Sequence, residues 1–584
     1  MKRIIITLLA VAAIGPVAMA QTMSDALTFS QNNYYGTARS MALGNAMTAL
    51  GGDLGSIGIN PAGSAVARYS QFAITPGYSI AGNNSAFSQS NFTMLTDAGT
   101  YKYEAGNFGP EGMDRYSRMT LPNLGFSVSY ETGQNYGVRN VSFAILSSNT
   151  SSYLNRFTAS GMNDNTSMLG YFATAATYAD MPYDVFDLGV DPYNYYNRDI
   201  VAAYDSYMIN PFGDKGYIGA TQSGTTGKNA SSFRNAGLLR QKSIVEQYGN
   251  KHDIVMNMAV NIDNTVFVGF NLGLPVINYS NTEYFGEDAD DPEQFPMSIV
   301  NNDGTVKDCN FQKANYAYQY SAMAEGIYAK IGVIYVPTDN FRFGLSLQTP
   351  TMLTVDESWT MAASTIISDV EHSASDVPEW SNRYNLRTPG IVSLGAAYTF
   401  AGRGFISVDY EFADYSAMKY STYEELALGE DDPFEQVNRL NSIFCGGSHA
   451  LRVGAEYKLT SAVSVRAGYD FTSSPVKYYR DGDLLIDAEY FDANYELYDL
   501  GFNPFEHKHS MKMPVRSWSF GLGWSSSGSF YVDAAIRGTY YPTTYYQPYP
   551  VYQSFDDGYS YTASALVKNT RRMLDMALTL GWRF

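Results

Sequence analysis

The side chains that could do chemistry are few and form no catalytic arrangement. Among the five histidines, only His507 and His509 could share a metal, because two imidazoles two residues apart lie on one face of an extended chain. No third ligand follows at a suitable spacing, and no Gly-x-Ser-x-Gly segment supplies a nucleophile. We therefore predict that the protein is not an enzyme and has no catalytic residue, no metal site and no cofactor.

Acidic side chains gather in short clusters, none of which has the ligand spacing of a calcium loop. We interpret them as solvated loops that account for the formal net charge of -19, a charge that also excludes nucleic acid as a partner. The clusters lie at Glu287 to Asp291, Glu430 to Asp432, Asp481 to Asp487 and Asp556-Asp557.

Basic side chains alternate with apolar ones, as in Leu451-Arg452-Val453. Arginine at the midplane of a membrane barrel costs roughly 2 to 4 kcal/mol, so these cations should point inward. Two roles stay open for them. They could bind the carboxylate of an amphipathic ligand, or they could pair with acids on neighbouring strands, such as Asp409, Glu456 and Asp470. The candidate ligand-binding cations are Lys330, Arg342, Arg452 and Arg466.

The elements that would position these cations are β-strands with one apolar face. Residues 254–262 and 266–274 alternate apolar and polar side chains around the turn Asp263-Asn264, which predicts a hairpin. The same pattern recurs to the end of the chain and predicts about 14 strands, the even number that bacterial barrels use. They begin near residues 69, 120, 138, 250, 264, 315, 340, 383, 403, 447, 461, 511, 528 and 568.

The connections between the predicted strands alternate between short turns and long segments. This asymmetry is typical of a transmembrane antiparallel β-barrel with long extracellular loops, and a soluble β-sandwich has no reason to show it. The aromatic content of 15% and the charged content of 16% fit a barrel in lipid. The largest predicted loop, about 151–249, should fold over the barrel mouth. Cys309 and Cys445 should lie in outward-facing loops, either as one bridge or as two free thiols.

The two ends of the chain indicate export and barrel assembly. Lys2 and Arg3, an apolar run to Val17 and the small residues around Met19 predict a signal peptide, residues 1–20, that is cleaved after Ala20. No other stretch is long and apolar enough for a membrane helix. At the other end the strand finishes on an outward-facing Phe584, which resembles the signal read by the barrel-assembly machinery.

Residues 21–68 do not fit the strand pattern. They show helical spacing around Ala38 to Leu50, then a glycine-rich run and the turn Asn60-Pro61-Ala62-Gly63. We expect this segment to form a plug or hatch ahead of a barrel made by residues 69–584, although a periplasmic tail or a simple tight turn at Asn60-Pro61 would also fit the residues alone.

The stretch ALGNAMTALGGDLGSIGINPAG, residues 42–63, resembles the N-terminal hatch of the FadL/TodX family of outer-membrane channels for long-chain fatty acids and aromatic hydrocarbons. Three later stretches are similar to strands of that family, at 344–350, 389–415 and 451–476. The likeness spans most of the chain but is strong only in these patches, and the loops do not match.

The resemblance implies a barrel plugged by its hatch, which captures hydrophobic or amphipathic small molecules at its loops and releases them sideways through its wall. The hatch would then include Asn60, Pro61 and Ala62. These residues would lie next to an inward kink of the third strand, near the lateral opening. We expect a monomer in contact with outer-membrane lipid and lipopolysaccharide. A surface receptor for a haem-like or host ligand and a general diffusion porin are the alternatives.

Overall fold

The computed structural model of the chain describes most residues after Thr22. The described residues are 22–88, 92–96, 99–103, 112–164, 166–187, 189–213, 216–223, 234–300, 305–375, 377–400, 402–424, 426, 431–477, 508–510, 513–526, 528–549, 552–554, 560–562 and 566–584. The predicted signal peptide, residues 1–20, lies outside them.

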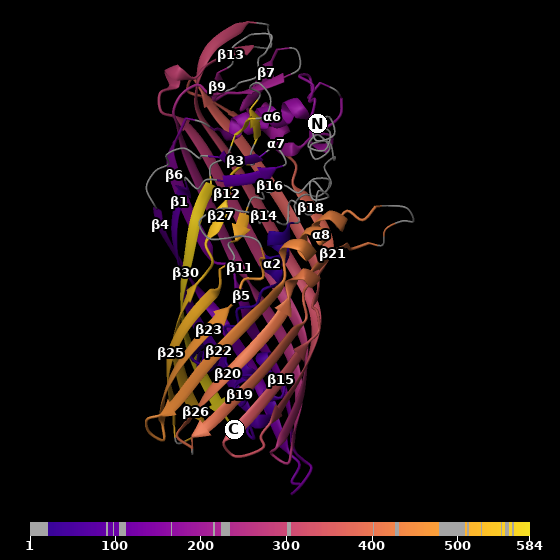
Figure 1. Cartoon of the computed structure of the whole chain (residues 1–584), viewed down its shortest axis with the longest axis vertical. Coiled ribbons are helices and arrows are strands. Elements are labelled where there is room, and N and C mark those ends of the chain that lie inside the picture. The colour runs from indigo at the N-terminus through magenta and orange to yellow at the C-terminus, as the bar shows by residue number, and fades with distance from the viewer. Residues whose placement is uncertain are drawn as a thin grey trace.

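The chain forms a closed antiparallel β-barrel of 14 strands, which confirms the predicted fold class (Figure 1). Closure comes from pairing of the first strand with the last, in register from Gln71 opposite Arg583 to Ser88 opposite Leu566. The strands are β1 (Gln71–Ser88), β4 (Gly112–Glu131), β5 (Val138–Ser152) continued by β6 (Asn155–Asn163), β11 (Leu239–Ile262), β12 (Val266–Ala289), β14 (Val306–Tyr335), β15 (Phe341–Gln348) continued by β16 (Met352–Ile367), β18 (Trp380–Arg387) continued by β19 (Ile391–Phe400), β20 (Gly404–Asp414) continued by β21 (Lys419–Thr422), β22 (Gly447–Lys458), β23 (Val463–Thr472), β25 (Val515–Ser525), β26 (Phe530–Tyr540) continued by β27 (Thr544–Tyr546), and β30 (Leu566–Arg583).

The barrel wall has an apolar outer face and a polar inner face, as the alternation predicts. Leu451 is 47% exposed while the adjacent Arg452 is 3% exposed. Aromatic rings meet around the end of the barrel where the short turns lie, as in the contact of Phe530 with Trp582 at 5.0 Å between ring centroids. Such a ring of aromatic side chains is typical of a membrane interface.

Several strands are longer than the sequence pattern predicts. Strand β11 begins at Leu239 instead of near residue 250, and β4 begins at Gly112 instead of near residue 120. Beyond the apolar band the outer face no longer has to be apolar, so the pattern fades while the backbone pairing continues. Prolines 350 and 389 interrupt two neighbouring strands, because proline has no N–H for the ladder.

The N-terminal segment lies inside the barrel. It contains four short helices, α2 (Met23–Ser30), α3 (Ala38–Ala42), α4 (Leu54–Ile59) and α5 (Gly63–Val66). We call residues 22–36, which include α2, the arm, and residues 37–67, which include α3 to α5, the floor. Almost every side chain of the floor is buried. No helix in the described part of the chain is long and apolar enough to cross a membrane.

The long-loop end of the barrel carries a helical cap, drawn at the top of Figure 1. Its helices α6 (Met168–Tyr178) and α7 (Arg198–Asp205) come from the connection between β6 and β11 and share one apolar cluster with Phe285, Phe311 and Tyr546 of the strands below. The remaining elements are β2 (Phe92–Thr96), β3 (Gly99–Tyr103), η1 (Pro192–Asn194), β7 (Ile209–Phe212), β8 (Gly216–Gly219), β9 (Gln222–Ser223), β10 (Arg234–Asn235), η2 (Pro292–Gln294), β13 (Pro296–Val300), β17 (Val370–Ser373), η3 (Tyr415–Ala417), α8 (Glu435–Phe444), β24 (Lys508–Ser510), β28 (Tyr552–Ser554) and β29 (Ser560–Thr562).

Both cysteines are buried, and no disulfide joins them. Cys309 lies within β14 and Cys445 ends α8, so the expectation that both lie in outward-facing loops is wrong for Cys309. The strand β14 begins at Val306, several residues earlier than the sequence pattern indicated.

Candidate functional site

The wall of the barrel is interrupted between its second and third strands. Pairing of β4 with β5 runs from Glu131 opposite Asn140 to Asn123 opposite Ser148 and stops there. Above this point β4 still pairs with β1, and β6 pairs with β11. Between them, β4 and β6 share no described ladder, so the hydrogen-bonded wall has a break, here called the gap, that starts at Asn123 and Ser148. The strands are still in contact above it, because Ser85 Oγ of β1 donates to the carbonyl oxygen of Thr158 in β6 at 2.7 Å and Gly112 of β4 lies against the same carbonyl.

The gap exists because the third strand bends into the lumen. Leu154, in the break between β5 and β6, is fully buried and packs against Ala81 of β1 and Met573 of β30. Neither of these strands is a neighbour of β5 in the sheet order, so the chain at Leu154 must lie on their inner face. Arg571 of β30 stabilises the bend by donating from Nη2 to the carbonyl oxygen of Ser152 at 3.1 Å.

The arm supplies hydrogen bonds that the bent strand would otherwise find in a neighbouring strand. The N–H of Asn33 donates to the carbonyl oxygen of Thr150 at 2.7 Å, and the N–H of Tyr35 donates to Asn149 at 3.1 Å. Unpaired buried carbonyls are costly, so the bend and the arm stabilise each other. Lys251 of β11 also binds the arm. Its Nζ donates to the carbonyl oxygen of Phe29 at 3.2 Å and to Asn32 Oδ1 at 3.0 Å.

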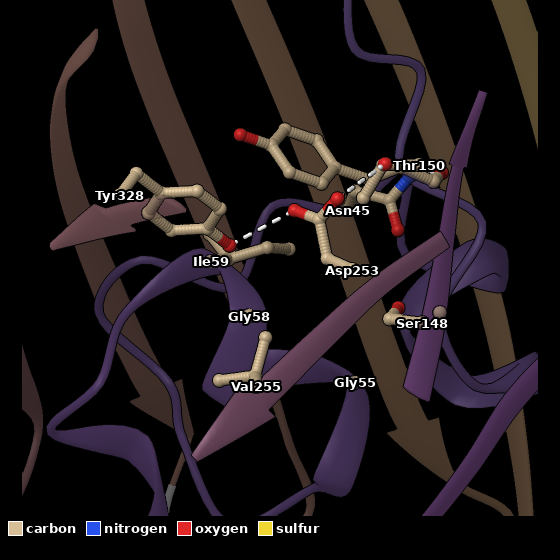
Figure 2. Close-up of a pocket in the computed structure, with 11 residues that line it drawn as sticks. Asn45, Gly55, Gly58, Ile59, Ser148, Thr150, Asp253, Val255 and Tyr328 are labelled. Carbon is tan, nitrogen blue, oxygen red and sulfur yellow. Dashed lines mark hydrogen bonds between the residues drawn. The ribbon is translucent and has the colours of Figure 1, made fainter. Parts of the chain in front are cut away.

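A small cavity lies where the arm, the floor and the bent strand meet (Figure 2). Asp253 of β11 is at its centre and accepts hydrogen bonds from Thr150 Oγ1 at 3.0 Å and Tyr328 Oη at 2.9 Å. The cavity has room for about one water molecule. Its other lining residues are Tyr34, Gly36, Asn45, Gly55, Gly58, Ile59, Ser148 and Val255.

The edge of the gap is polar and incompletely satisfied. Asn123 is fully buried, and neither its Oδ1 nor its Nδ2 has a hydrogen-bond partner among the residues that the structure describes. Opposite it, residues 147–152 read Ser-Ser-Asn-Thr-Ser-Ser, and all but the first of them are buried. A buried amide without partners costs about 1 to 3 kcal/mol, so this edge is suited to a polar group that the chain itself does not supply.

The lumen above the floor is apolar, and the arm fills it. Leu27 and Phe29 of α2 belong to one cluster with Tyr279, Leu353 and Tyr384 of the surrounding strands. Phe29 meets Tyr279 edge to face at 5.8 Å between ring centroids. This volume is lined by the kind of surface that binds a hydrocarbon chain, and α2 occupies it.

The predicted hatch motif packs tightly against the wall. Asn60 Nδ2 donates to the carbonyl oxygens of Thr48 at 2.7 Å and Val333 at 3.2 Å, while its Oδ1 accepts from the N–H of Ala62 at 3.1 Å. Pro61 lies directly on Gly269, where a Cβ would come within 2.3 Å of the Pro61 carbonyl carbon.

The motif therefore contacts β12 and β14, the fifth and sixth barrel strands. The third strand is contacted by the floor residues on either side of the motif. Ser64 Oγ is 2.8 Å from Ser142 Oγ, and Leu54 and Ile57 pack in one cluster with Ala144 and Leu146 of β5. The motif and the bend of the third strand are thus separate features of the floor and the wall.

The four candidate ligand-binding cations all point into the lumen and all have protein partners. Lys330 Nζ donates to the Gly58 carbonyl at 2.7 Å, and Arg342 donates to the Leu50 carbonyl at 3.1 Å. Arg452 contacts Glu411 at 2.9 Å and Asp470 at 3.3 Å. Arg466 contacts Glu456 at 2.6 Å and Asp533 at 2.5 Å. A ligand carboxylate would have to displace one of these partners.

One ion pair links this network to the floor. Arg39 Nε lies 3.0 Å from Glu456 Oε2, the carboxylate that also contacts Arg466. Asp409 adds a second link by accepting from the N–H of Thr48 at 2.7 Å. Removing one member of a buried ion pair leaves an uncompensated charge, so the floor is held more firmly than the arm.

The described residues contain no group of three His, Cys, Asp or Glu side chains that could hold a metal ion. His507, one half of the imidazole pair in the sequence, lies outside the described residues.

Sequence reasoning missed the residues that form the gap. The bend was not expected at Tyr153-Leu154, because the predicted loop of about 151–249 already included these residues. The polar run 147–152 was the available signal, since a polar stretch at the end of a membrane strand must leave the lipid-facing wall. Asn33 and Tyr35 carry no signal, because they act through their backbone.

No family model and no curated protein sequence matches the chain. Among solved structures, a FadL homologue from Pseudomonas aeruginosa is similar over 94% of this chain and 99% of its own, with 11% identity and a TM-score of 0.48. The toluene transporter TodX from Pseudomonas putida covers 95% of this chain and 99% of its own, with 11% identity and a TM-score of 0.41. The chain is similar to these two proteins in fold. The outer-membrane channel DcaP of Acinetobacter baumannii is less similar, with a TM-score of 0.24 over 88% of this chain and 97% of its own at 9% identity.

Proposed function

We propose that the protein is a passive outer-membrane channel that takes up hydrophobic or amphipathic small molecules and releases them sideways, between β4 and β6, without chemical change. The gap in the wall above Asn123 and Ser148 carries this proposal, because β4 and β6 share no described backbone ladder there that a ligand would have to break to leave the lumen. We propose export through the signal peptide, assembly through the signal at Phe584, and a monomer that contacts outer-membrane lipid and lipopolysaccharide.

The arm is the part that moves in this proposal. An incoming ligand takes the place of α2 among Tyr279, Leu353 and Tyr384, and the apolar surface that α2 buries there is replaced by that of the ligand. Departure of the arm also removes the hydrogen bonds from Asn33 and Tyr35 to the bent strand. Capture of the ligand and opening of the gap are thereby coupled, because both depend on the arm leaving its place.

The floor stays in place and acts as the hatch against water and ions. Its ties to the wall are ionic at Arg39 and hydrogen-bonded at Asn60, and its side chains are almost all buried. This arrangement supports selective lateral release over the general porin alternative, since a porin needs an open aqueous lumen.

The surfaces of the lumen and of the gap, which the ligand would pass in turn, indicate the class of ligand. The lumen offers apolar and aromatic side chains for a hydrocarbon part, and the gap offers the unpartnered amide of Asn123 for a polar group. Long-chain fatty acids meet both requirements. The four inward cations stay candidates for a carboxylate only if a protein partner is displaced.

The test is to purify the protein in detergent, extract it for bound lipid and haem, and measure single-channel conductance in a planar bilayer. We expect bound fatty acid and negligible conductance. A large steady conductance would instead show a porin. Haem without lipid would favour a surface receptor. Either result would overturn the proposal.

A further inference from the structure

One stretch of the outer face is basic although the chain as a whole is acidic. Arg516 on β25, Arg572 on β30 and Arg115 on β4 are all exposed. Strand pairing places them in one row, because Arg516 is opposite Tyr540, Tyr540 is opposite Arg572, and Gly82 of β1 is opposite both Arg572 and Arg115. The row runs Arg516, Tyr540, Arg572, Gly82, Arg115.

The row marks the upper boundary of the apolar band on these five strands. Four residues lower on each strand, a parallel row reads Phe520, Ile536, Met576, Tyr78 and Met119. Its members Phe520 and Met119 are 56% and 81% exposed. On β4, β25 and β30, side chains that face hydrocarbon are thus replaced by guanidinium groups within four residues along the strand.

The height of the row agrees with the edge of a membrane. Trp582, in ring contact with Phe530 and Phe72, marks the aromatic girdle at the short-turn end. Arg572 lies ten residues earlier on β30 (582 − 572), about 34 Å along the strand at ~3.4 Å per residue. At a tilt of about 40° this distance spans about 26 Å along the barrel axis, close to the height of a barrel's apolar band.

Among the described residues of these five strands, no acid shares the outer face with the three arginines at this height. The acidic side chains that the structure describes on these strands point inward at Asp114, Asp533 and Asp575, apart from Glu131 at the short-turn end. A fourth cation, Lys568, is exposed on β30 above the row. Arg572 also lies over the Tyr540 ring, with its guanidinium carbon 5.6 Å from the ring centroid.

We propose that this row is a docking site for the phosphorylated saccharide head group of lipopolysaccharide. Arginine binds phosphate through two parallel hydrogen bonds, and exposed arginines at a lipid boundary find few other anions. Arg516 and Arg572 are two strands apart, as are Arg572 and Arg115, which gives about 10 Å for each step at ~4.8 Å per strand. A rigid head group with two phosphates can engage two of these positions together, whereas a phospholipid with one phosphate engages one.

The test is native mass spectrometry of the detergent-purified full chain, titrated with a deep-rough lipopolysaccharide and separately with phosphatidylglycerol. The variant carries Arg115→Gln, Arg516→Gln and Arg572→Gln. The matched control carries Arg68→Gln, Arg403→Gln and Lys458→Gln, three exposed cations at the short-turn end. Heat-dependent gel migration shows that each variant is a folded barrel.

We expect the first variant to bind the glycolipid about tenfold more weakly or worse, while the control binds it like the parent. The parent should bind phosphatidylglycerol more weakly than the glycolipid. Equal glycolipid binding by parent and first variant would overturn the site. Equal binding of both lipids by the parent would overturn the assignment to lipopolysaccharide. Neither readout depends on transport, so these results are separate from the fate of the proposed channel.

Discussion

The backbone N–H of Asn33 donates a hydrogen bond of 2.7 Å to the carbonyl oxygen of Thr150. This bond joins the arm inside the lumen to the part of the third strand that has left the wall. Thr150 therefore finds in the arm a partner that a regular barrel would provide from a neighbouring strand. The occupancy of the lumen and the shape of the wall depend on each other at this point.

Replacing Asn33 by proline should loosen the arm, because proline removes the N–H that donates to Thr150. We expect the free energy of local opening of residues 31–36 to fall by about 1 kcal/mol. Hydrogen–deuterium exchange of that peptide in nanodiscs measures the change. Asn33→Ala keeps the N–H and is the matched control. If proline and alanine give the same exchange, the bond to Thr150 contributes nothing.

Two deletions should separate the arm from the floor. Removing residues 22–31 takes away α2 and leaves the floor, so conductance should stay near that of the parent. Removing residues 21–68 should open a steadily conducting pore, because the inside of a barrel of this width is otherwise open. Single-channel recording in planar bilayers measures both. Unchanged conductance after the longer deletion would show that the segment is no hatch.

A disulfide can test whether the floor has to move. Ser64 Oγ of the floor and Ser142 Oγ of β5 are 2.8 Å apart, so Ser64→Cys with Ser142→Cys should form a bridge under oxidation. We expect uptake of radiolabelled oleate by cells to be the same in the bridged and reduced states. The pair Thr75→Cys with Thr579→Cys, whose hydroxyls are also 2.8 Å apart, links two wall strands and is the control. Loss of uptake only in the first bridged variant would mean that the floor moves too.

The wall of the barrel could be predicted from the sequence because its side-chain pattern is set by the membrane. Lipid faces one side of every strand, so the alternation at Leu451 and Arg452 fixes inside and outside residue by residue. The same logic predicted that Lys330 and Arg466 point inward, and both side chains are buried. It also named Glu456 as a possible partner on a neighbouring strand, and Arg466 lies 2.6 Å from it. The contact of Lys330 with the Gly58 carbonyl could not be predicted, because it joins residues 272 positions apart.

The gap and its contacts had no comparable signal. The bend at Leu154 depends on packing against Ala81 and Met573, which the sequence places far away. The arm binds the bent strand through backbone groups that every residue has. What the sequence did contain was the polar run from Ser147 to Ser152, which no lipid-facing strand could keep in the wall.

Substitution of Asn123 by an apolar residue should raise the stability of the protein and lower its uptake of amphipathic ligands. Replacing Asn123 by leucine removes a buried amide without partners, so the free energy of unfolding should rise by about 1 to 3 kcal/mol. Under the proposed path, uptake of oleate should fall while uptake of toluene, which has no polar group, is retained. Urea unfolding in detergent and radiolabel uptake measure the two effects.

The matched control for Asn123 is Asn271→Leu. Asn271 is equally buried, but its Nδ2 donates to the Ile57 carbonyl at 2.8 Å and its Oδ1 accepts from Asn257 at 2.7 Å. This substitution should therefore lower the free energy of unfolding. If both leucine variants are destabilised alike, Asn123 has partners in the folded protein and its proposed role at the gap is lost.

The cap should be held more firmly at acidic pH through Glu287, which lies at the upper end of β12, beyond the membrane-spanning part. It is fully buried and accepts from Ser167 Oγ at 2.6 Å, the N–H of Met168 at 2.9 Å and Gln241 Nε2 at 2.7 Å, which ties it to the start of α6. Burial raises the pKa of this carboxyl from 4.5 to about 7. The docked cap therefore keeps a proton that the undocked carboxyl loses between these values.

It follows that docking of α6 weakens as the pH rises from about 5 to about 7 and changes little above that. We expect the free energy of opening to fall by roughly 1 to 3 kcal/mol over this range. Hydrogen–deuterium exchange of the α6 peptide, corrected for the intrinsic pH dependence of exchange, measures it. Glu287→Gln removes the titrating group and should give a flat profile. A parent profile as flat as that of the glutamine variant would show that Glu287 does not control the cap.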